Sequence, residues 1–466
     1  MTNIFGFLKR LHFVGIGGIG MSGIAKVLKN LEFEVSGSDV VENNTTRELR
    51  EFGIPVYIGH DSKNVQGAEL VVYSSAISKD NPELLAAEEA FIPIISRGEM
   101  LGELTRLKYS IAVAGSHGKT TTTSMITEIL TACEYDPTAI VGGLLNRTGS
   151  NARFGKQNVM VVEADESDKS FMKLYPSIAV ITNIDKEHME NYQDMEDVKS
   201  CFAAFANSVP FYGCAVICID DGNVADIIHK LNKRFISYGV KAQADVRGSN
   251  IVKTGFKVSF DVEYKENFLG RVSLYHPGDH IILNALAAIA VSIEMQAPFS
   301  SVCDLLANYA GVQRRLSMRY ESENLYVIDD YGHHPTEIAA TLKAAREALT
   351  GFKICVIFQP HRYSRTQNLK SEFAKCFLDA DYLFLTDIYP ASEEPIEGVD
   401  SEMLLEEIKR YGFKNAAYLK KWPDFYTRLD GIIDDNLAIV VMGAGNISKF
   451  SYELADYFSS KRIKIM

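Results

Sequence analysis

The 466-residue sequence predicts an α/β protein with three domains, each built on a mostly parallel sheet with flanking helices. Two observations support this prediction. Short apolar runs alternate with amphipathic stretches along most of the chain, which is typical of stacked strand–helix–strand units. The chain is also too long for one ordinary core, because domains usually span roughly 100–200 residues.

The first domain is predicted over residues 1–107 as a Rossmann-like unit. The apolar run LHFVG at 11–15 leads into GGIGMSGIAKVLKN, which indicates a strand, a tight turn and a helix. Further strands are expected at 33–39, 71–77 and 92–97.

The central domain is predicted over residues 108–313 and resembles a P-loop ATPase in its pattern. It begins with the strand YSIAVAG and the helix TTTTSMITEILTAC. Between about 235 and 276 the pattern changes to strict alternation, which predicts a small antiparallel addition with a turn at Lys265–Asn267. The other elements expected here are strands at 159–165, 178–185 and 214–220, and a helix at 284–295.

The last domain is predicted over residues 314–466 as a second Rossmann-like unit. One of its helices is expected to begin at Pro335, because proline suits the first position of a helix. Its strands are expected at 325–331, 353–359, 382–388 and 437–445.

Composition excludes several classes of protein. The net charge of −12 argues against a nucleic-acid or anionic-membrane surface. No apolar run approaches the roughly 20 residues that a membrane span needs, and glycines interrupt the run after Lys9 and Arg10 too early for a signal peptide. None of the seven cysteines lies in a C-x-x-C pair, and Cys214 and Cys218 are expected in the core. The sequence therefore predicts a cytoplasmic protein without membrane insertion.

The clearest motif is AGSHGKTTTT, which follows a strand and opens a helix. Backbone N–H groups in such a loop hold phosphate oxygens, Lys119 adds charge at the β- and γ-phosphates, and the Thr120 hydroxyl can bind Mg²⁺. The motif departs from the full P-loop pattern, because Val113 stands at its first glycine position. The alternative is a glycine turn with a chance Lys-Thr pair.

Two further predicted strands end in polar side chains. Because ligands in an open parallel sheet bind beyond the carboxyl ends of the strands, these groups are expected beside the phosphate loop. A carboxylate and an imidazole there could hold the metal that bridges ATP phosphates, whereas either run alone is more often a solvated loop. The groups are Glu163, Asp165, Glu166 and Asp168 after the first strand, and Asn183, Asp185, Glu187 and His188 after the second.

The N-terminal loop contains G-x-G-x-x-G as Gly15, Gly17 and Gly20, and Asp39 ends the next strand. By itself this pattern predicts an NAD(P)-dependent oxidoreductase. The same geometry binds other nucleotide diphosphates through backbone amides, and a second phosphate loop fits poorly with a dehydrogenase. A UDP-type ligand is therefore favoured, with a purely structural turn as the remaining alternative.

Together the motifs resemble those of the Mur ligases over nearly the whole chain. The matching stretches are HFVGIGGIGMSGIA, GSHGKTTTTSM, EADESD, TNIDKEHMENY, VPFYG, DDYGHHPTEI and QPHRYSRT. The resemblance implies a domain each for a UDP-sugar, ATP and an amino acid, in that order, and an ATP-dependent ligase of peptidoglycan precursor synthesis. It implies that UDP-N-acetylmuramate and L-alanine are joined through an acyl phosphate, with Mg²⁺ or Mn²⁺ as the metal.

The resemblance also assigns residues. The catalytic set it implies is Lys119, Glu163, His188, Arg362 and Arg365, with Thr120, Glu163 and His188 as metal ligands. The ATP-binding set is Gly115, Ser116, His117, Gly118, Lys119, Thr120, Thr121, Asn284, Arg315 and Asp330. The UDP-sugar set is Gly17, Gly18, Ile19, Gly20, Ser38, Asp39 and Ser74. Around the amino acid it implies Tyr331, His333, Arg362 and Arg365, and arginine suits a free carboxylate by charge alone.

Two departures from the family pattern matter. His280 is followed by Ile281 where the family often has asparagine, so adenine contacts can differ. Ala203 stands where sister ligases carry a lysine, often carbamylated, so no modified lysine is expected, as in the alanine-adding branch.

Three bound substrates imply domain closure, with hinges expected near 107 and 314. The remaining alternatives are a recycling ligase that attaches a peptide to the same sugar nucleotide and a non-catalytic nucleotide-binding regulator. Monomer and homodimer both stay open.

Overall fold

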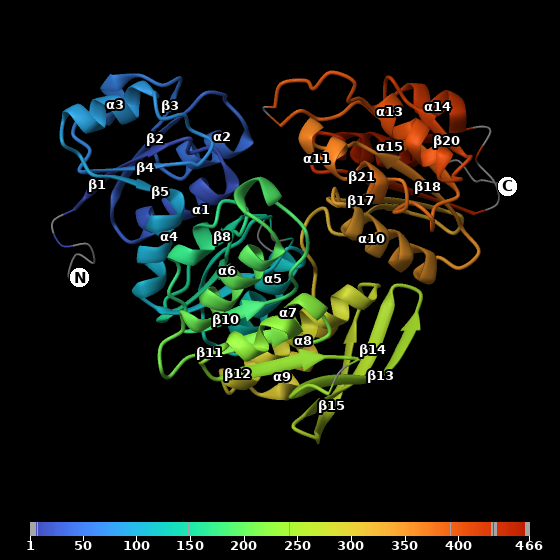
Figure 1. Ribbon diagram of the computed structural model, residues 1–466, viewed down its shortest axis with the longest axis horizontal. Coiled ribbons are helices and arrows are strands. Elements are labelled where there is room, and N and C mark those ends of the chain that lie inside the picture. The colour runs from blue at the N-terminus through green and yellow to red at the C-terminus, as the bar shows by residue number, and fades with distance from the viewer. Residues whose placement is uncertain are drawn as a thin grey trace. The chain divides into compact units, whose positions relative to one another are not determined.

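The computed structural model describes residues 6, 8–144, 146, 149–241, 243–391, 393–429, 432 and 436–461. They form three sheets with flanking helices (Figure 1). They fall into two compact units, and the first holds the chain up to Asn250 with Asp261–Val272 and Leu283–Ala310. The second unit holds Ile251–Phe260, Ser273–Ile282 and the chain from Gly311 onward. Among the described residues, no helix has the length and apolar composition that a membrane crossing requires.

The first sheet is parallel throughout, with the strand order β3-β2-β1-β4-β5. In this order the carboxyl ends of β1 and β4 form the point where the winding direction reverses, which is where such sheets bind nucleotides. The strands are β1 (Arg10–Val14), β2 (Glu34–Asp39), β3 (Val56–Ile58), β4 (Leu70–Tyr73) and β5 (Ile94–Ser96). The helices are α1 (Ile19–Asn30), α2 (Asn44–Glu51), η1 (Ser62–Val65), α3 (Pro82–Glu89) and α4 (Arg97–Arg106).

The second sheet has the order β15-β14-β13-β12-β11-β10-β6-β9-β7-β8. Its strands are β6 (Tyr109–Ala114), β7 (Thr138–Ile140), β8 (Ala152–Arg153), β9 (Val159–Glu163), β10 (Ile178–Ile181), β11 (Cys214–Cys218), β12 (Phe235–Gly239), β13 (Val246–Thr254), β14 (Lys257–Tyr264) and β15 (Asn267–Leu274). Its helices are α5 (Lys119–Ala132), η2 (Ser170–Lys173), η3 (Met189–Asn191), α6 (Met195–Asn207), α7 (Gly222–Ile227), η4 (Ile228–Lys230), α8 (Asp279–Glu294) and α9 (Phe299–Ala307).

The antiparallel addition predicted between about 235 and 276 is confirmed in part: β12 pairs parallel with β11 and β13, whereas the predicted turn connects β14 to β15. Only Lys265 and Glu266 connect β14 to β15, and both have positive φ (48° and 67°), as a two-residue hairpin turn requires. The helix predicted at 284–295 is longer than expected, since it begins at Asp279 and ends at Glu294.

The third sheet has the order β16-β17-β21-β18-β19-β20, and only the edge strand β16 runs antiparallel to its neighbour. Its strands are β16 (Ser317–Glu321), β17 (Leu325–Asp330), β18 (Lys353–Phe358), β19 (Tyr382–Leu385), β20 (Ala416–Tyr418) and β21 (Leu437–Met442). Its helices are α10 (Pro335–Ala348), α11 (Tyr363–Asn368), α12 (Lys370–Phe373), α13 (Ser401–Arg410), α14 (Asp424–Leu429) and α15 (Ser448–Lys461). Pro335 stands at the first position of α10, as predicted.

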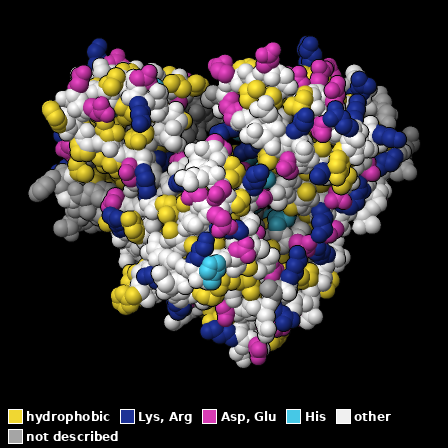
Figure 2. All heavy atoms as spheres, in the orientation of Figure 1, with side chains coloured by type: hydrophobic (Ala, Val, Ile, Leu, Met, Phe, Trp, Pro, Cys, Tyr) yellow, Lys and Arg dark blue, Asp and Glu magenta, His cyan; other side chains and the backbone are white. Residues whose placement is uncertain are grey.

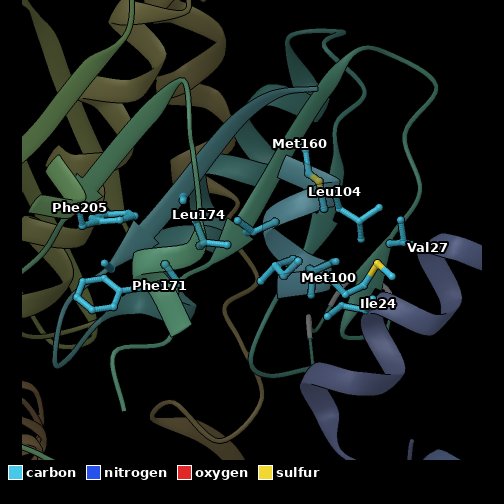
Figure 3. Packing of buried hydrophobic residues seen from close by; sticks show 14 of the residues in the cluster. Ile24, Val27, Met100, Leu104, Met160, Phe171, Leu174 and Phe205 are labelled. Carbon is cyan, nitrogen blue, oxygen red and sulfur yellow. The ribbon is translucent and has the colours of Figure 1, made fainter. Parts of the chain in front are cut away.

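One apolar core joins the first two sheets. Figure 3 shows its side chains from α1 and α4 beside those of η2 and α6, among them Ile24, Met100, Leu104, Phe171 and Phe205. Residue 107, where a hinge was predicted, lies inside the first compact unit, while the unit boundary at 310–311 lies close to the hinge predicted near 314. The domain limits at 107 and 313 stay predictions.

Candidate active site

The central phosphate loop connects β6 to α5. Gly115 (φ 140°) and Gly118 (φ 80°) adopt backbone conformations that favour glycine. A Cβ on Gly118 would also lie 2.5 Å from Oδ1 of Asn284 on α8, so the bare glycine lets that amide approach the loop. The sequence therefore places a helix N-terminus and Asn284 at one loop, which is an arrangement suited to binding phosphate.

Lys119 is the first residue of α5, and its ammonium group donates hydrogen bonds to three oxygen atoms of the protein. Its Nζ donates to the carbonyl oxygens of Gly115 (2.6 Å) and Ser116 (3.0 Å) and to Oε1 of Glu166 (2.8 Å). Burial alone would lower the pKa of Lys119, but the charges of Glu166, Glu163 and Glu187 outweigh burial and raise it. Lys119 therefore stays a cation at neutral pH.

Residues that follow β10 form hydrogen bonds with the phosphate loop. The backbone N–H of His117 donates to Oδ1 of Asn183 (2.8 Å), and the Thr182 hydroxyl donates to the carbonyl of His117 (2.6 Å). Ser116 Oγ accepts from the backbone N–H of Asp185 (2.8 Å), and the His117 ring contacts the Asp185 carboxylate at 3.0 Å. Asn183 and Asp185, expected beside the loop, thus hold its shape.

Thr120 and Glu163, two of the predicted metal ligands, lie together. Thr120 Oγ1 donates to Oε1 of Glu163 (3.1 Å), and the other carboxylate oxygen accepts from the backbone N–H of Gly142 (2.7 Å). Thr121 is buried on the same helix, one position further along. A hydroxyl and a carboxylate at this spacing are donors that suit Mg²⁺.

The third predicted ligand, His188, lies in a different group of donors. One ligand atom each of Glu166, Glu187 and His188 lie within 4.8 Å of one another. His188 also has a left-handed backbone (φ 54°), a strained state for a non-glycine residue that concentrates at functional sites. Oxygen donors with an imidazole fit a divalent cation, and Glu166 Oε2 is buried with no hydrogen-bond partner in the described residues.

The N-terminal glycine loop follows β1. The backbone N–H of Gly17 donates to Oδ2 of Asp39 (2.8 Å), and the N–H groups of Gly15 and Ile16 both donate to the carbonyl of Ser38 (2.9 Å). Gly18 precedes α1, which begins at Ile19, and Gly20 lies in its first turn. Ser74, just after β4, lies 3.2 Å from where a Gly15 Cβ would be. The structure thus brings together the predicted UDP-sugar residues Gly17, Gly18, Ile19, Gly20, Asp39 and Ser74.

The side chain of Ser38 points elsewhere, into a buried polar network that sequence reasoning missed. Its hydroxyl donates to Oε2 of Glu83 (2.5 Å), which also contacts His60 (3.2 Å) and His12 (3.7 Å), and Asn64 donates to Oε1 (2.5 Å). Burial alone would raise the pKa of Glu83, but the His12, Ser38 and Asn64 donors lower it to about 2. Ser38 therefore faces the glycine loop through its carbonyl only.

The predicted amino-acid residues lie beyond the carboxyl ends of β17 and β18. The rings of Tyr331 and His333 pack edge to face (5.3 Å between centroids), and His333 packs likewise on His361 (5.6 Å). Arg365 Nη1 lies 3.4 Å from Nδ1 of His361, and Arg362 (φ 71°) directly precedes α11. His361 links the predicted residues but was not itself predicted, although it stands directly before Arg362 in the motif.

Burial lowers the pKa of His361 to about 3, with His333, Arg365 and Arg362 acting in the same direction. His361 is therefore neutral at pH 7 and adds no charge of its own beside Arg362 and Arg365. This arrangement suits a carboxylate ligand.

Arg315 and Asp330, predicted for ATP, lie in the same part of the chain. Arg315 Nη1 contacts Glu337 at 3.4 Å, and its guanidinium lies 5.3 Å from the centre of the Tyr331 ring. Asp330 is buried and accepts from the backbone N–H groups of Leu316 and Gly332 (both 2.8 Å), and burial raises its pKa. Through these hydrogen bonds Asp330 connects backbone groups of its own compact unit.

Family models match the chain in three consecutive segments. The model described as the Mur ligase family catalytic domain matches residues 10–109. The Mur ligase middle domain matches residues 113–292, and the model described as the Mur ligase glutamate ligase domain matches residues 314–445.

Relatives cover the chain nearly end to end. The UDP-N-acetylmuramate–L-alanine ligase of Trichlorobacter lovleyi is 49% identical over 445 residues, which are 95% of this chain and 98% of the relative. The protein of the same name from Myxococcus xanthus is 48% identical, over 96% of this chain and 94% of its own.

Among solved structures, the UDP-N-acetylmuramate-alanine ligase of Thermotoga maritima superposes with a TM-score of 0.81 at 31% identity, over 97% of this chain and 100% of that one. A murein peptide ligase from Psychrobacter arcticus shares the fold with a TM-score of 0.69 at 23% identity, over 96% and 98%.

Proposed function

The chain belongs to the Mur ligase family, and from this premise we propose that it is an ATP-dependent ligase that forms the amide bond between UDP-N-acetylmuramate and L-alanine. The observation that carries the proposal is that about half of the residues are identical to those of ligases of that name, over nearly the full length of the chain. The family assignment removes the oxidoreductase alternative.

The reaction needs an activated carboxyl group, because a carboxylate is a poor electrophile. In the proposed mechanism the muramyl carboxylate attacks the γ-phosphorus of ATP, the bond from that phosphorus to the β–γ bridging oxygen breaks, and an acyl phosphate forms as ADP leaves. The amine of L-alanine then attacks the acyl carbon, and phosphate leaves from a tetrahedral intermediate. The protein's main contribution is to position the groups and to neutralise the charge that develops on the phosphoryl oxygens.

The residues of the central loop would perform the first step. Lys119 and the loop backbone would hold the ATP phosphates, and Asn284 would contact the nucleotide beside Gly118. Thr120 and Glu163 would hold one Mg²⁺, and Glu163 and His188 would hold a second, which neutralise phosphate charge when bound. Glu166 and Glu187 lie beside His188 and offer further donors. Each of these donors lies at the end of β9, the end of β10 or the start of α5.

The residues beyond β17 and β18 would bind the amino acid. Arg362 and Arg365 would grip the carboxylate, and Tyr331 and His333 would line the site around its side chain. The methyl group that separates alanine from glycine is worth only about 1–3 kcal/mol in such a site, so glycine is expected to react slowly. A location in the cytoplasm stays a prediction from the sequence.

Phosphate release by the purified protein tests the proposal. With Mg²⁺, ATP, UDP-N-acetylmuramate and L-alanine, release should require every component. Turnover with a peptide but not with alanine would move the assignment to the recycling branch. If folded protein releases no phosphate with any amine, the result would favour the non-catalytic regulator.

A further inference from the structure

The loop between β9 and η2 carries two consecutive acids, and each contacts a cation that lies beside a different glycine-rich loop. Glu166 accepts from Lys119 of the central phosphate loop at 2.8 Å. Asp165 accepts from Nη2 of Arg97 at 2.9 Å through its Oδ2. One short segment therefore contacts the positive charge of both predicted nucleotide sites.

Arg97 lies against the N-terminal glycine loop. It is the first residue of α4, and a Cβ built on Gly20 would come within 3.0 Å of its Nη1. Gly20 lies in the first turn of α1, where unpaired backbone N–H groups and the helix dipole favour a phosphate. The side chain of Arg97 is only 16% exposed, so an anion at this loop would meet a largely desolvated guanidinium.

Close packing fixes Arg97 in this place. A Cβ on Gly98 would lie 2.5 Å from Cβ of Ser170, and a Cβ on Gly102 would lie 2.4 Å from the carbonyl oxygen of Lys173. These glycines, four positions apart on α4, let the helix backbone approach η2 directly. Arg97 is consequently held over the loop that begins at Asp165.

The acidic loop is anchored by hydrogen bonds of its own, and one oxygen of each carboxylate contacts a cation. The Tyr192 hydroxyl donates to the carbonyl of Glu166 (2.6 Å), and Ser167 donates to Oδ1 of Asp165 (2.6 Å). Glu166 Oε2 has no hydrogen-bond partner among the described residues. A phosphate that arrives at either cation is itself an anion, so it competes directly with the carboxylate already bound there.

We propose that Asp165 and Glu166 are positioning residues that couple the two phosphate loops. In the ligand-free protein each acid neutralises one loop cation. A diphosphate at the N-terminal loop takes Arg97 from Asp165, and the freed acid lets its neighbour Glu166 leave Lys119 for the incoming ATP. Coupling of binding is reciprocal, so each nucleotide strengthens the binding of the other. The identity of the ligands rests on the proposed function.

Calorimetry on the full chain tests this coupling. The Kd of a non-hydrolysable ATP analogue with Mg²⁺ is measured with and without UDP-N-acetylmuramate, in the wild type, Asp165→Asn and Glu166→Gln. Glu103→Gln is the matched control, because it removes one charge from an exposed pair with Arg106 on α4. Circular dichroism melting shows that each variant is folded, and Arg97→Gln breaks the same Asp165 contact from its other side.

We expect the sugar nucleotide to tighten analogue binding about tenfold in the wild type and in Glu103→Gln. In Asp165→Asn and Arg97→Gln the effect should fall below about twofold. In Glu166→Gln the analogue alone should bind about as tightly as it binds wild type with the sugar nucleotide present.

Full coupling in Asp165→Asn and Arg97→Gln, or no coupling in the wild type, would overturn this inference and leave the proposed function standing. If folded wild type binds neither nucleotide, the proposed function fails and the inference fails with it.

Discussion

Glu83 and Glu166 are both buried carboxylates beside a nucleotide loop, yet their pKa values move in opposite directions. The pKa of Glu83 falls to about 2, whereas that of Glu166 rises. Glu83 receives hydrogen bonds from Ser38 and Asn64 and lies between two histidines. Burial raises the pKa of Glu166 despite Lys119, and the nearby charges of Asp165 and Glu187 act with burial.

The difference shows that the neighbours of a buried carboxylate decide whether it serves structure or function. A carboxylate surrounded by donors is stable as an anion and holds its surroundings together. A carboxylate that shares its site with other acids is poorly stabilised, and it gives up its partner readily when a phosphate or a metal arrives. Figure 2 shows acidic and basic side chains interspersed on the surface, where water screens their charges.

The largest expected effect comes from removing the cation beside Glu166. Lys119→Ala should lower kcat/KM by at least about 10³-fold, or about 4 kcal/mol, because the γ-phosphate loses its charged donor. Initial rates of phosphate release at ATP concentrations well below KM measure it. Activity within tenfold of wild type would contradict the role of Lys119.

The next effect tests the structural acid. Glu83→Gln should lower the free energy of unfolding by about 3 kcal/mol at pH 7, which is the equivalent of its pKa shift. Urea unfolding followed by circular dichroism measures this change. A loss below about 1 kcal/mol would mean that the buried anion contributes little.

The lowered pKa of Glu83 also predicts that the stability difference between wild type and Glu83→Gln depends on pH. The folded-state pKa of Glu83 is depressed from the ordinary 4.5 to about 2, so its contribution is present above pH 4.5 and is lost as the pH falls toward 2. The stability difference between wild type and Glu83→Gln should therefore shrink by about 2 kcal/mol between pH 6 and pH 3. A difference that stays constant with pH would show that Glu83 is not the titrating group.

The smallest expected effect is the matching substitution at the other acid. Glu166→Gln should change the free energy of unfolding by less than about 1 kcal/mol at pH 7, because relief from Asp165 and Glu187 offsets the lost contact with Lys119. The same unfolding experiment measures it. Equal destabilisation by Glu83→Gln and Glu166→Gln would break the comparison.

Much of the fold and part of the site could be predicted from local patterns. Buried strands of a parallel sheet appear as short apolar runs, and the predicted strands at 109–115, 214–220 and 353–359 each contain an observed strand. The phosphate loop was predictable because glycine, lysine and threonine carry their chemistry at fixed spacing along the chain. Thr120 and Glu163 were predictable as neighbours, since β6 and β9 end at the same edge.

The contacts that distinguish neighbouring acids were not predictable. Glu163, Asp165 and Glu166 lie within four residues of sequence, but they contact Thr120, Arg97 and Lys119 respectively. Arg97 and Glu83 lie in no recognisable motif, and their partners are far away along the chain. Ser38, predicted to contact the sugar nucleotide, turns its hydroxyl to Glu83, because alternate residues of a strand point to opposite faces.

The sequence by itself determined the α/β class, the two glycine loops and the residue types at the ends of the strands, because these depend on periodicity and spacing within short stretches. Only the tertiary structure decided which acid meets which cation, and hence which buried carboxylate is structural and which is exchangeable. The physical reason is that the free energy of a buried charge depends on neighbours brought from distant segments, such as Glu83 from α3 against His12 from β1, and local sequence carries no record of them.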